Sequence, residues 1–211
     1  MDDTPVTVAA VDTVGPDALA LTLETPEGFD AQPGQFIKFT TTVDGDPTSR
    51  FYSISSPTVA ETFELTVGID PEGAVGPQLR ELSAGSTVQL SGPYGNAHYE
   101  GEDSVLVLAG GPGIGPAVGI AERTLQEGGD AAVVYRDDQP IHRERLADLE
   151  VRGGAVEILD SDDPLREGIE RAGLDDRQVF IYGFVDFLDD ATSALAAAGG
   201  EPDRAKVENF G

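Results

Sequence analysis

Two short stretches of the sequence carry residue types that could bind a ligand with a phosphate and a flat ring. In Arg50-Phe51-Tyr52-Ser53, a guanidinium, a phenol and a hydroxyl follow one another. Because side chains alternate between the two faces of a strand, Arg50 and Tyr52 should share one face. Arginine supplies a forked cation for a phosphate, tyrosine a surface for a ring system and serine a short donor and acceptor. An ordinary strand with a surface salt bridge is the alternative interpretation.

The second stretch is rich in glycine and follows an apolar run. Residues 105–109 read Val-Leu-Val-Leu-Ala and residues 110–116 read Gly-Gly-Pro-Gly-Ile-Gly-Pro, which predicts a strand, a tight loop and a helix that begins near Pro116. Glycine amides beside a helix N-terminus favour an anion, most of all a pyrophosphate. The stretch matches neither the nucleoside triphosphate loop nor the dinucleotide fingerprint, which has a glycine where Pro116 stands. A turn without a ligand is the alternative.

The composition limits the classes of partner. The chain has 211 residues, 39 of them acidic and 13 basic, and a net charge of −26 at pH 7. Nucleic acid and anionic membranes would meet a field of like sign, so we expect neither as a partner. Lys38 and Lys206 are the only lysines, and the acidic residues are spread along the whole chain. This pattern is typical of a protein from a high-salt cytoplasm, where counterions screen the self-repulsion.

The absence of cysteine excludes disulfides, zinc thiolate sites and cysteine-ligated iron-sulfur clusters from this chain. Any iron-sulfur group must therefore belong to another polypeptide. His98 and His142 are the only histidines and lie far apart in the sequence, so we predict no metal site. The sequence has no export signal and no apolar run near the ~20 residues of a membrane helix. We therefore expect a cytoplasmic protein without membrane insertion.

Short β-type runs fill the chain up to about residue 101, separated by Gly, Pro, Asp and Ser. Leu19, Leu21 and Leu23 alternate with polar or small residues, so one face of each strand should be buried. Six strands at this spacing predict a small closed antiparallel barrel. The predicted strands are residues 6–14, 19–25, 35–43, 51–55, 62–69 and 87–91. A short helix is predicted to start at Pro77, which gives a second N-terminus for an anion.

From residue 104 onward the pattern changes to strands that alternate with helices. This alternation predicts a parallel sheet with crossover helices on both faces. The predicted strands are 104–109, 131–135, 155–159 and 178–182, and the predicted helices are 116–127, 143–150, 164–172 and 186–198. Ligands of such sheets bind beyond the carboxyl ends of the strands, where residues 110–115 and Gly183-Phe184 fall. We therefore predict two domains, residues 1–101 and residues 102–211.

Four motifs resemble those of the ferredoxin-NADP reductase family, in the family's order. Arg50-Phe51-Tyr52-Ser53 is similar to its Arg-x-Tyr-Ser signature and residues 92–95, Gly-Pro-Tyr-Gly, to its barrel-closing turn. Residues 110–116 resemble its nicotinamide loop, and Glu208-Asn209-Phe210 resembles its Glu-x-aromatic ending. The resemblance implies an antiparallel six-stranded flavin-binding barrel followed by a five-stranded parallel nucleotide-binding sheet with flanking helices. It also implies a flavin-dependent NAD(P)H oxidoreductase with FAD as its cofactor.

The resemblance implies a role for individual residues. Arg50 would hold the FAD pyrophosphate, Tyr52 would pack on the isoalloxazine and Ser53 would bond near flavin N5. Tyr52, Ser53, Glu208 and Phe210 would form the catalytic set, with Phe210 against the exposed flavin face. Further cofactor-binding residues would be Val67, Gly68, Ile69, Ala74, Val75 and Gly76 for FAD, and Gly110, Gly111, Pro112, Gly113, Ile114, Arg136, Gly183 and Phe184 for NAD(P)H.

The chain departs from the family at several of these positions. Gly76 stands where serine is frequent, Pro112 where threonine is common and Gly115 where alanine is usual. Tyr182-Gly183-Phe184 replaces a typical Cys-Gly-Pro, which removes a group that the family places beside the nicotinamide. Arg136 could meet the 2′-phosphate of NADPH, but the two aspartates that follow it would repel one. The sequence therefore leaves the choice between NADH and NADPH open and favours NADH.

The leading functional hypothesis is an FAD-dependent oxidoreductase. It would take hydride from NAD(P)H and pass electrons singly to a separate carrier, such as a ferredoxin or another small iron-sulfur protein. An alternative is a flavin-bearing electron-transfer subunit of a larger complex, with a vestigial nicotinamide site. A third hypothesis is a flavin-free interaction domain, which the intact stretch at residues 50–53 disfavours. The sequence makes no prediction about the oligomeric state.

Overall fold

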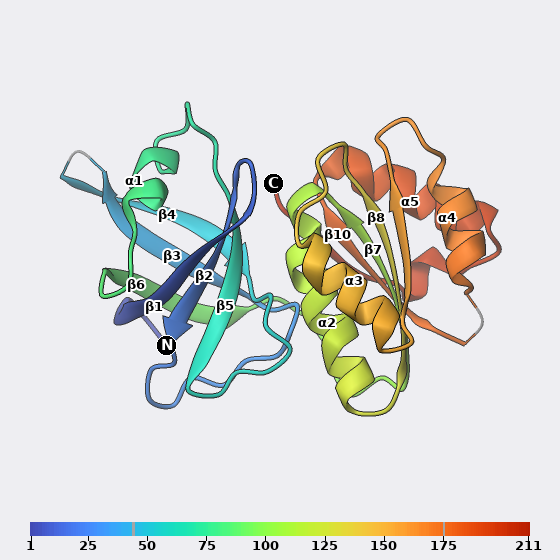
Figure 1. Cartoon of the computed structure of the whole chain (residues 1–211), viewed down its shortest axis with the longest axis horizontal. Coiled ribbons are helices and arrows are strands. Elements are labelled where there is room, and N and C mark those ends of the chain that lie inside the picture. The colour runs from blue at the N-terminus through green and yellow to red at the C-terminus, as the bar shows by residue number, and fades with distance from the viewer. Residues whose placement is uncertain (44, 175) are drawn as a thin grey trace.

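An antiparallel barrel forms the first half of the chain in the computed structural model, which describes residues 1–43, 45–174 and 176–211 (Figure 1). Its sheet has the strand order β4-β3-β6-β1-β2-β5 in the described residues. A bridge between Ile54 and Leu65 brings the two edge strands together, so the sheet closes as predicted. The strands are β1 Thr4–Gly15, β2 Ala18–Glu24, β3 Phe36–Val43, β4 Asp46–Ser53, β5 Thr62–Gly68 and β6 Thr87–Tyr94.

Two barrel strands differ from their predicted bounds. β4 begins at Asp46 rather than at residue 51, because Pro47 and its neighbours pair with the end of β3. β6 continues to Tyr94, through residues that we expected to form a turn. Tyr94 pairs with Phe36 across the sheet and its ring lies 5.8 Å from the Phe36 ring, a contact that extends the strand.

The barrel interior is filled by the alternate residues of its strands. Leu21, Leu23, Phe63 and Leu65 are at most 1% exposed, as the alternation predicted. Burial of one such side chain stabilises the fold by about 1.5 to 3 kcal/mol. The short helix α1, Gly76–Glu81, starts one residue before the predicted Pro77 and inserts the buried Leu79 into the same core.

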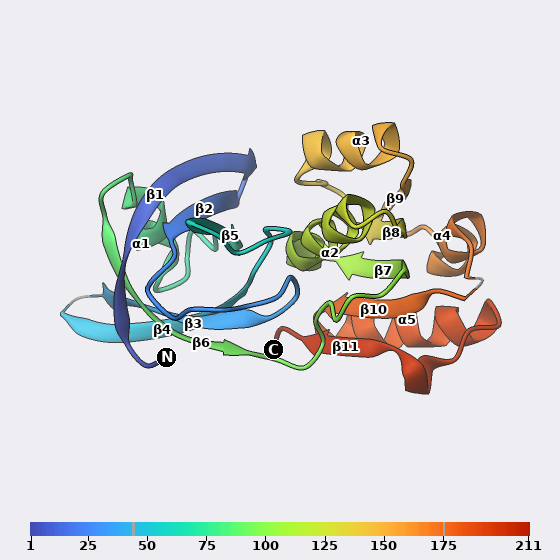
Figure 2. The same ribbon diagram turned by 90° about the horizontal axis from the view of Figure 1, so that it is seen from below.

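A parallel sheet with the order β11-β10-β7-β8-β9 forms the second half. Helices α2 and α3 cover one face and α4 and α5 the other (Figure 2). Because both faces are covered, β7 and β8 are apolar and buried along most of their length. The elements are β7 Ser104–Gly110, α2 Ile114–Gln126, β8 Asp130–Arg136, α3 Arg143–Val151, β9 Ala155–Leu159, α4 Leu165–Ala172, β10 Gln178–Gly183, α5 Val185–Ala197 and β11 Lys206–Asn209, with single 3-10 turns at Gly111–Gly113 and Pro202–Arg204.

The last strand, β11, carries the C-terminal motif into the sheet. It pairs in parallel with β10, with Tyr182 opposite Glu208 and Gly183 opposite Asn209. The periodic pattern indicated four strands, and only the resemblance implied this fifth one, which the structure confirms.

The two halves meet along one seam. Helix α2 lies between the sheet of the second half and β5 of the barrel, and the C-terminus lies at the seam in both views (Figures 1 and 2). None of the helices in the described residues is long and apolar enough to cross a membrane. The arrangement brings residues 50–53, the glycine loop and the C-terminal motif to the same region of the molecule.

Candidate functional site

A groove runs along the seam and joins three cavities. The central cavity, of about 160 Å³, is lined by both halves of the chain. Its lining residues are Phe51, Tyr52, Ser53, Thr66 and Gly68 from the barrel and Pro112, Phe184 and Phe210 from the second half. Gly68, Pro112 and Phe184 also line a cavity of about 620 Å³ on one side. Phe51, Ser53 and Phe210 also line one of about 570 Å³ on the other side. The three cavities therefore form one continuous groove.

Strand β4 presents the predicted residues on this groove. Tyr52 packs against Phe39 with the ring centroids 5.7 Å apart, and burial raises the pKa of Tyr52 to about 12 in spite of nearby Arg50. The phenol is therefore neutral near pH 7. Ser53 is 8% exposed and borders two of the cavities. Tyr52 and Ser53 both line the central cavity, as expected of residues that touch one ligand.

Arg50 lies two residues before Tyr52, on the same side of β4. It is exposed and donates a hydrogen bond of 2.8 Å to the carbonyl of Ser49. Among the described residues, no carboxylate lies within 4.0 Å of its guanidinium. An unpaired arginine in a chain of net charge −26 is available for an anionic ligand.

At the end of β5, the backbone of one residue, Gly68, is exposed to the groove. Val67 is fully buried in the barrel core, and Ile69 packs there too. Gly68 points the other way, and a Cβ built on it would meet nothing within 4 Å. Of these three predicted residues, Gly68 thus forms the open cradle, whereas Val67 turns its side chain into the core because a strand alternates its faces. The placement of residues 67–69 along the flavin stays a prediction.

The residues around the start of α1 do not reach the three cavities. Val75 is buried in the barrel core, Ala74 is exposed, and α1 has six residues. A Cβ on Gly76 would collide with the carbonyl of Asp70. Packing against this carbonyl explains why glycine stands at position 76. The structure therefore leaves the predicted role of residues 74–76 in phosphate binding unsupported by groove geometry.

The glycine loop is packed tightly from behind. Residues Gly111–Gly113 form a 3-10 turn and α2 starts at Ile114, two residues before the predicted Pro116. Cβ atoms at Gly110 and Gly113 would collide with the Phe187 ring and the Tyr182 carbonyl respectively. The glycines at 110 and 113 thus permit close packing inside the protein rather than the approach of a ligand.

Gly111 and Pro112 are the loop residues that border the groove. Gly111 has a φ of 54°, a left-handed conformation that suits glycine. Ile114 is fully buried, and its N–H already donates to the carbonyls of Gly111 and Pro112. Neither the side chain nor the amide of Ile114 faces the groove, so the geometry does not support its predicted contact with the cofactor, which stays a prediction.

The end of β10 differs from the expected open approach. Tyr182 is fully buried and donates a hydrogen bond to the carbonyl of Ala97, so it faces the joint between the halves and not the groove. A Cβ on Gly183 would lie 2.7 Å from the Phe187 ring, which again makes this glycine a packing residue. Phe184 is 52% exposed and meets Phe210 edge to face, with centroids 6.1 Å apart.

Strand β11 places both residues of the C-terminal motif. The amide of Phe210 donates to the carbonyl of Gly183 at 3.0 Å, which fixes its ring beside Phe184. Glu208 is half-buried, and burial raises its pKa above the usual value. Its carboxylate faces Gly95 and lines the cavity of about 570 Å³. Both residues thus reach the groove, as predicted.

Three aromatic residues of the groove were missed by the sequence analysis: Phe36, Phe51 and Tyr94. They lie on the outer face of neighbouring strands, and the Phe36 and Phe51 rings meet edge to face at 5.7 Å. Phe51 is 63% exposed, although the outer face of a barrel is normally polar. Side chains alternate along β4, so a Tyr52 side chain that points inward places the Phe51 side chain on the outer face. An aromatic residue at this outward position is the sequence feature that could have predicted Phe51 as a groove residue.

The far end of the groove is acidic. Arg136 bonds Asp190 at 2.9 Å and lies 5.3 Å from the Phe187 ring, so it is already occupied. Asp137 and Asp138 line the cavity of about 620 Å³. Hydrogen bonds from the Ser161 amide and hydroxyl lower the pKa of Asp138 and keep it charged. The pairing with Asp190 and the neighbouring aspartates disfavour a contact of Arg136 with a 2′-phosphate, and the predicted role of Arg136 in cofactor binding stays a prediction.

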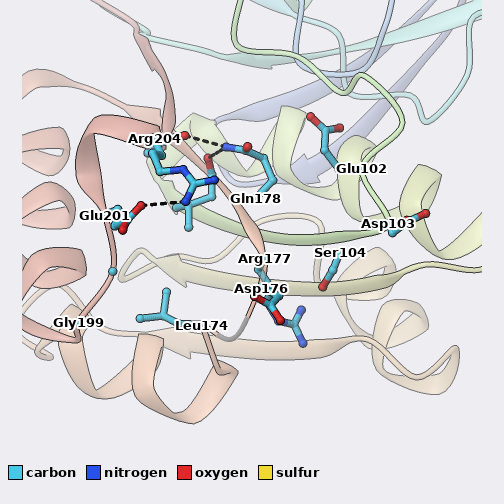
Figure 3. A pocket seen from close by; sticks show the side chains of 13 residues that line it. Glu102, Asp103, Ser104, Leu174, Asp176, Arg177, Gln178, Gly199, Glu201 and Arg204 are labelled. Carbon is cyan, nitrogen blue, oxygen red and sulfur yellow. Dashed lines mark hydrogen bonds and ion pairs between the residues drawn. The ribbon is translucent and has the colours of Figure 1, made fainter.

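A further cavity of about 690 Å³ lies elsewhere, at the amino edge of the parallel sheet (Figure 3). Its cations are already paired, because Arg177 bonds Asp130 at 2.6 Å and Arg204 bonds Glu201 at 2.9 Å. No group of three or more His, Asp or Glu side chains in the described residues could hold a metal ion. The seam groove is consequently the better site.

The chemistry of the groove fits a dinucleotide with a flat ring. The central cavity offers aromatic surfaces from Tyr52 and Phe210, a hydroxyl from Ser53 and bare backbone at Gly68. Arg50 lies on the same side of β4 as Tyr52 but does not line the three cavities, and its guanidinium suits a pyrophosphate that extends beyond them. These residues present what FAD would require.

Comparison with known proteins relates the chain to flavin enzymes. Residues 5–99 match the model of the oxidoreductase FAD-binding domain. A glycine betaine monooxygenase reductase subunit of Pseudomonas aeruginosa is 35% identical over 108 residues, which are 49% of this chain and 30% of that protein. The ferredoxin reductase component of a 3-ketosteroid-9-alpha-monooxygenase of Mycolicibacterium smegmatis is 31% identical over 92% of this chain and 62% of its own length. The chain thus spans less than two thirds of each relative.

Solved structures share the fold over the whole chain. The FAD/NAD-binding domain of a nitric oxide dioxygenase from Vibrio cholerae superposes with a TM-score of 0.86 at 21% identity, covering 100% of both chains. A ferredoxin NADP+ reductase from Neisseria gonorrhoeae, with bound FAD and NADP, gives a TM-score of 0.81 at 19% identity, also over 100% of both chains.

Proposed function

We propose that the chain is a member of the ferredoxin-NADP reductase family and an FAD-dependent NAD(P)H oxidoreductase. Residues 5–99 match the oxidoreductase FAD-binding domain, and the whole chain shares the fold of a ferredoxin NADP+ reductase. Bound FAD would accept two electrons from the nicotinamide and release them singly to a separate acceptor. The protein's own part is to bind, orient and shield the two ligands.

Each wall of the groove has its own task in this proposal. Tyr52 supplies the surface on which the ring system packs, Ser53 a hydrogen bond at the edge of that ring, and Arg50 the cation for the pyrophosphate. Gly68 allows the ring to lie against bare backbone. Phe210 covers the opposite side, and Glu208 stands beside it as a half-buried carboxyl group.

The observation that carries the proposal is the central cavity itself. Tyr52 and Ser53 come from the barrel, whereas Pro112, Phe184 and Phe210 come from the second half, and all five line one space of about 160 Å³. One ligand bound by the barrel and a second ligand bound by the other half would lie next to each other in this space. A short distance between the two ligands is the condition for electron transfer between them.

We also propose that NADH is the donor. The cavity beyond Gly111 is lined by Asp137 and Asp138, and Arg136 is held by Asp190. A 2′-phosphate placed there would meet carboxylates without a free cation. A ribose with a free 2′-hydroxyl could instead donate a hydrogen bond to an aspartate.

An anaerobic titration tests both statements. Purified protein should be yellow, and stepwise addition of NADH should bleach the flavin absorption bands at a lower concentration than NADPH does. Colourless protein after reconstitution with FAD would contradict the flavin assignment. Equal bleaching by the two nucleotides would contradict the NADH preference alone.

A second candidate function has one observation in its favour. Phe184 and Phe210 stand edge to face over the side of the groove where a nicotinamide would enter. A flavin subunit of a larger complex, reduced by another component, would show the same closed pair. Flavin that stays oxidised in excess NADH and NADPH, but is bleached by dithionite, would support this candidate.

The proposal also covers the electron acceptor, the domain boundary and the cellular location. We propose an electron-carrier protein as the acceptor, because two of the relatives are reductase components of oxygenases; a small iron-sulfur protein is the specific form. We place the domain division near residue 101, between β6 and β7. The acidic composition supports a location in a cytoplasm of high salt.

A further inference from the structure

One arginine bonds both halves of the molecule at once. Arg145 lies in the first turn of α3, and its Nε and Nη2 donate to the two carboxylate oxygens of Glu122 on α2 at 2.7 Å each. Nη1 donates to Glu64 on β5 at 2.8 Å, and Nη2 donates to the carbonyl of Ser55 at 2.6 Å. Glu122 belongs to the second half, whereas Glu64 and Ser55 belong to the barrel.

These contacts lie directly behind the two walls of the groove. Ser55 follows Ser53 by two residues, and Glu64 lies on the same strand as Thr66 and Gly68. Glu122 lies on α2, the helix that starts at the glycine loop. Figure 1 shows α2 between β5 and the parallel sheet. Arg145 therefore links the element that carries Ser53 to the element that carries the nicotinamide loop.

The cluster is sheltered from solvent. The side chains of Arg145, Glu64 and Glu122 are 23%, 26% and 12% exposed. Salt screens such pairs less than surface pairs, and a bidentate arginine contact also fixes geometry. The Ser55 hydroxyl donates to the same Glu64 oxygen at 2.7 Å, so both barrel partners of Arg145 are joined to each other.

Close packing surrounds this cluster. Thr66 Oγ1 and His142 Nε2 are hydrogen-bonded at 2.7 Å in a buried position between the halves. A Cβ on Gly119 would lie 2.8 Å from the Ser55 carbonyl, so α2 touches the barrel backbone directly. The two surfaces fit in one arrangement, and the arginine bonds hold them there.

We propose that Arg145 is a positioning residue for electron transfer: it holds the Ser53 wall of the groove in register with the glycine-loop wall. This inference rests on the proposed function. A displacement of about 1 Å between two reacting groups costs roughly 100-fold in rate. Loss of the Arg145 bonds to the barrel should therefore slow transfer between the ligands without removing a group that touches either ligand.

The kinetic test compares Arg145 of α3 with Arg152, the residue that follows this helix, in the FAD-loaded protein. Arg145→Gln removes the bonds to the barrel, whereas Arg152→Gln changes an arginine whose polar partners, among the described residues, are Asp148 and the Glu122 carbonyl, both in the second half. Rapid anaerobic mixing with saturating NADH measures the rate of flavin bleaching. We expect a decrease of about 10- to 100-fold for Arg145→Gln with an unchanged FAD content, and a rate close to the wild type for Arg152→Gln.

Two carboxylate variants separate positioning from general stability. Glu64→Gln weakens the ion pair across the seam, and Glu122→Gln weakens the one within the second half. Positioning predicts slower bleaching for Glu64→Gln than for Glu122→Gln at comparable melting temperatures. If the rate of flavin bleaching instead falls in proportion to the melting temperature in both variants, the proposal is overturned. Arg145 would then have a structural role only.

Amide hydrogen exchange supplies a readout that does not depend on the flavin. In Arg145→Gln, the amides of residues 54–66 and 115–122 should exchange faster than in the wild type, and in Arg152→Gln they should not. Unchanged exchange at these amides would overturn the proposal. If the wild-type protein takes up FAD but neither nucleotide bleaches it, the proposed function fails, while the exchange experiment still decides whether Arg145 joins the halves.

Discussion

Gly68 and Gly115 illustrate two opposite uses of glycine within one seam. A Cβ on Gly68 would enter open space in the groove, whereas a Cβ on Gly115 would lie 2.7 Å from Thr66. The first glycine leaves room for a ligand and the second lets α2 approach β5. Sequence inspection treated the glycines of the nicotinamide loop alike, because the neighbour of a missing side chain is visible only in three dimensions.

The residue Gly68 offers a direct test of the groove. Gly68→Val should fold normally, since its side chain meets nothing and valine suits a strand, but it should fill the space of the ring and abolish FAD uptake. Flavin absorbance after reconstitution measures the effect, and far-UV circular dichroism the fold. Gly115→Val is the matched control that should destabilise the protein by steric conflict. Full flavin occupancy in Gly68→Val would place the ligand elsewhere.

Arg50 gives a second prediction at this scale. Arg50→Ala should weaken FAD binding by about 10- to 150-fold, because a charge-assisted hydrogen bond contributes roughly 1.5 to 3 kcal/mol. Equilibrium dialysis measures the affinity. Arg166→Ala, which removes an arginine of an exposed surface pair, is the control and should retain flavin like the wild type. Equal affinity of the two variants would argue against a phosphate at Arg50.

The sequence predicts the face of a strand on which a side chain lies better than it predicts the partners of that side chain. The strand period placed Arg50 and Tyr52 on one face, and the same period placed Val67 in the core once its strand was known. The partners of Arg136 and Arg145 could not be foreseen, because Asp190, Glu64 and Ser55 are distant in the sequence. Burial and pairing across distant segments are decided by the fold and not by local pattern.

At the scale of elements, apolar periodicity predicted the long helices and the central strands to within a few residues. It failed for β11, whose four residues are only partly buried and carry no alternating apolar pattern. Its place is fixed by the hydrogen bonds of β10. The same limit explains β4 and β6, whose ends are extended by pairing with β3.

The entry to α3 carries a prediction about acid stability. Burial, with a contribution from Arg145, lowers the pKa of His142 to about 3 from its ordinary value of 6.5. The unfolded chain therefore binds the proton more tightly than the folded chain. The stabilisation is complete above pH 6.5 and is lost as the pH falls toward 3, on the order of 5 kcal/mol in total.

His142→Asn removes this titration and keeps a residue that tolerates the left-handed backbone at a φ of 53°. Denaturation curves of both proteins at several pH values between 7 and 4 measure the difference. The wild type should lose stability relative to the variant as the pH falls, because His142 takes up a proton on unfolding and asparagine does not. Both proteins have the same carboxylates, so the effects of these groups cancel in the difference. A constant difference across this range would show that His142 is not held neutral by the fold.

At the scale of the whole molecule, the net charge of −26 dominates. Most arginines in the described residues are paired with carboxylates, including the sheltered pairs of Arg145 and Arg177, so the excess negative charge has no protein partner. Counterions must supply the screening, and their reach falls from about 10 Å at 0.1 M salt to about 3 Å at 1 M.

Stability should therefore depend on salt. The melting temperature is expected to rise as KCl increases from 0.05 M toward 2 M, because self-repulsion in the compact state is progressively screened. Calorimetry or circular dichroism gives the measurement, and sucrose at matched water activity controls for general exclusion effects. A melting temperature that does not change over this range would contradict the assignment to a high-salt environment.

The order of the strands along the chain has a consequence for biosynthesis. All strands of the barrel precede residue 95, whereas the Phe210 ring is placed only when β11 has paired with β10. Domains tend to fold from the N-terminus while translation continues. A ribosome-bound chain could thus complete the barrel wall of the groove, with Tyr52 and Ser53, well before β11 brings Phe210 to the opposite wall.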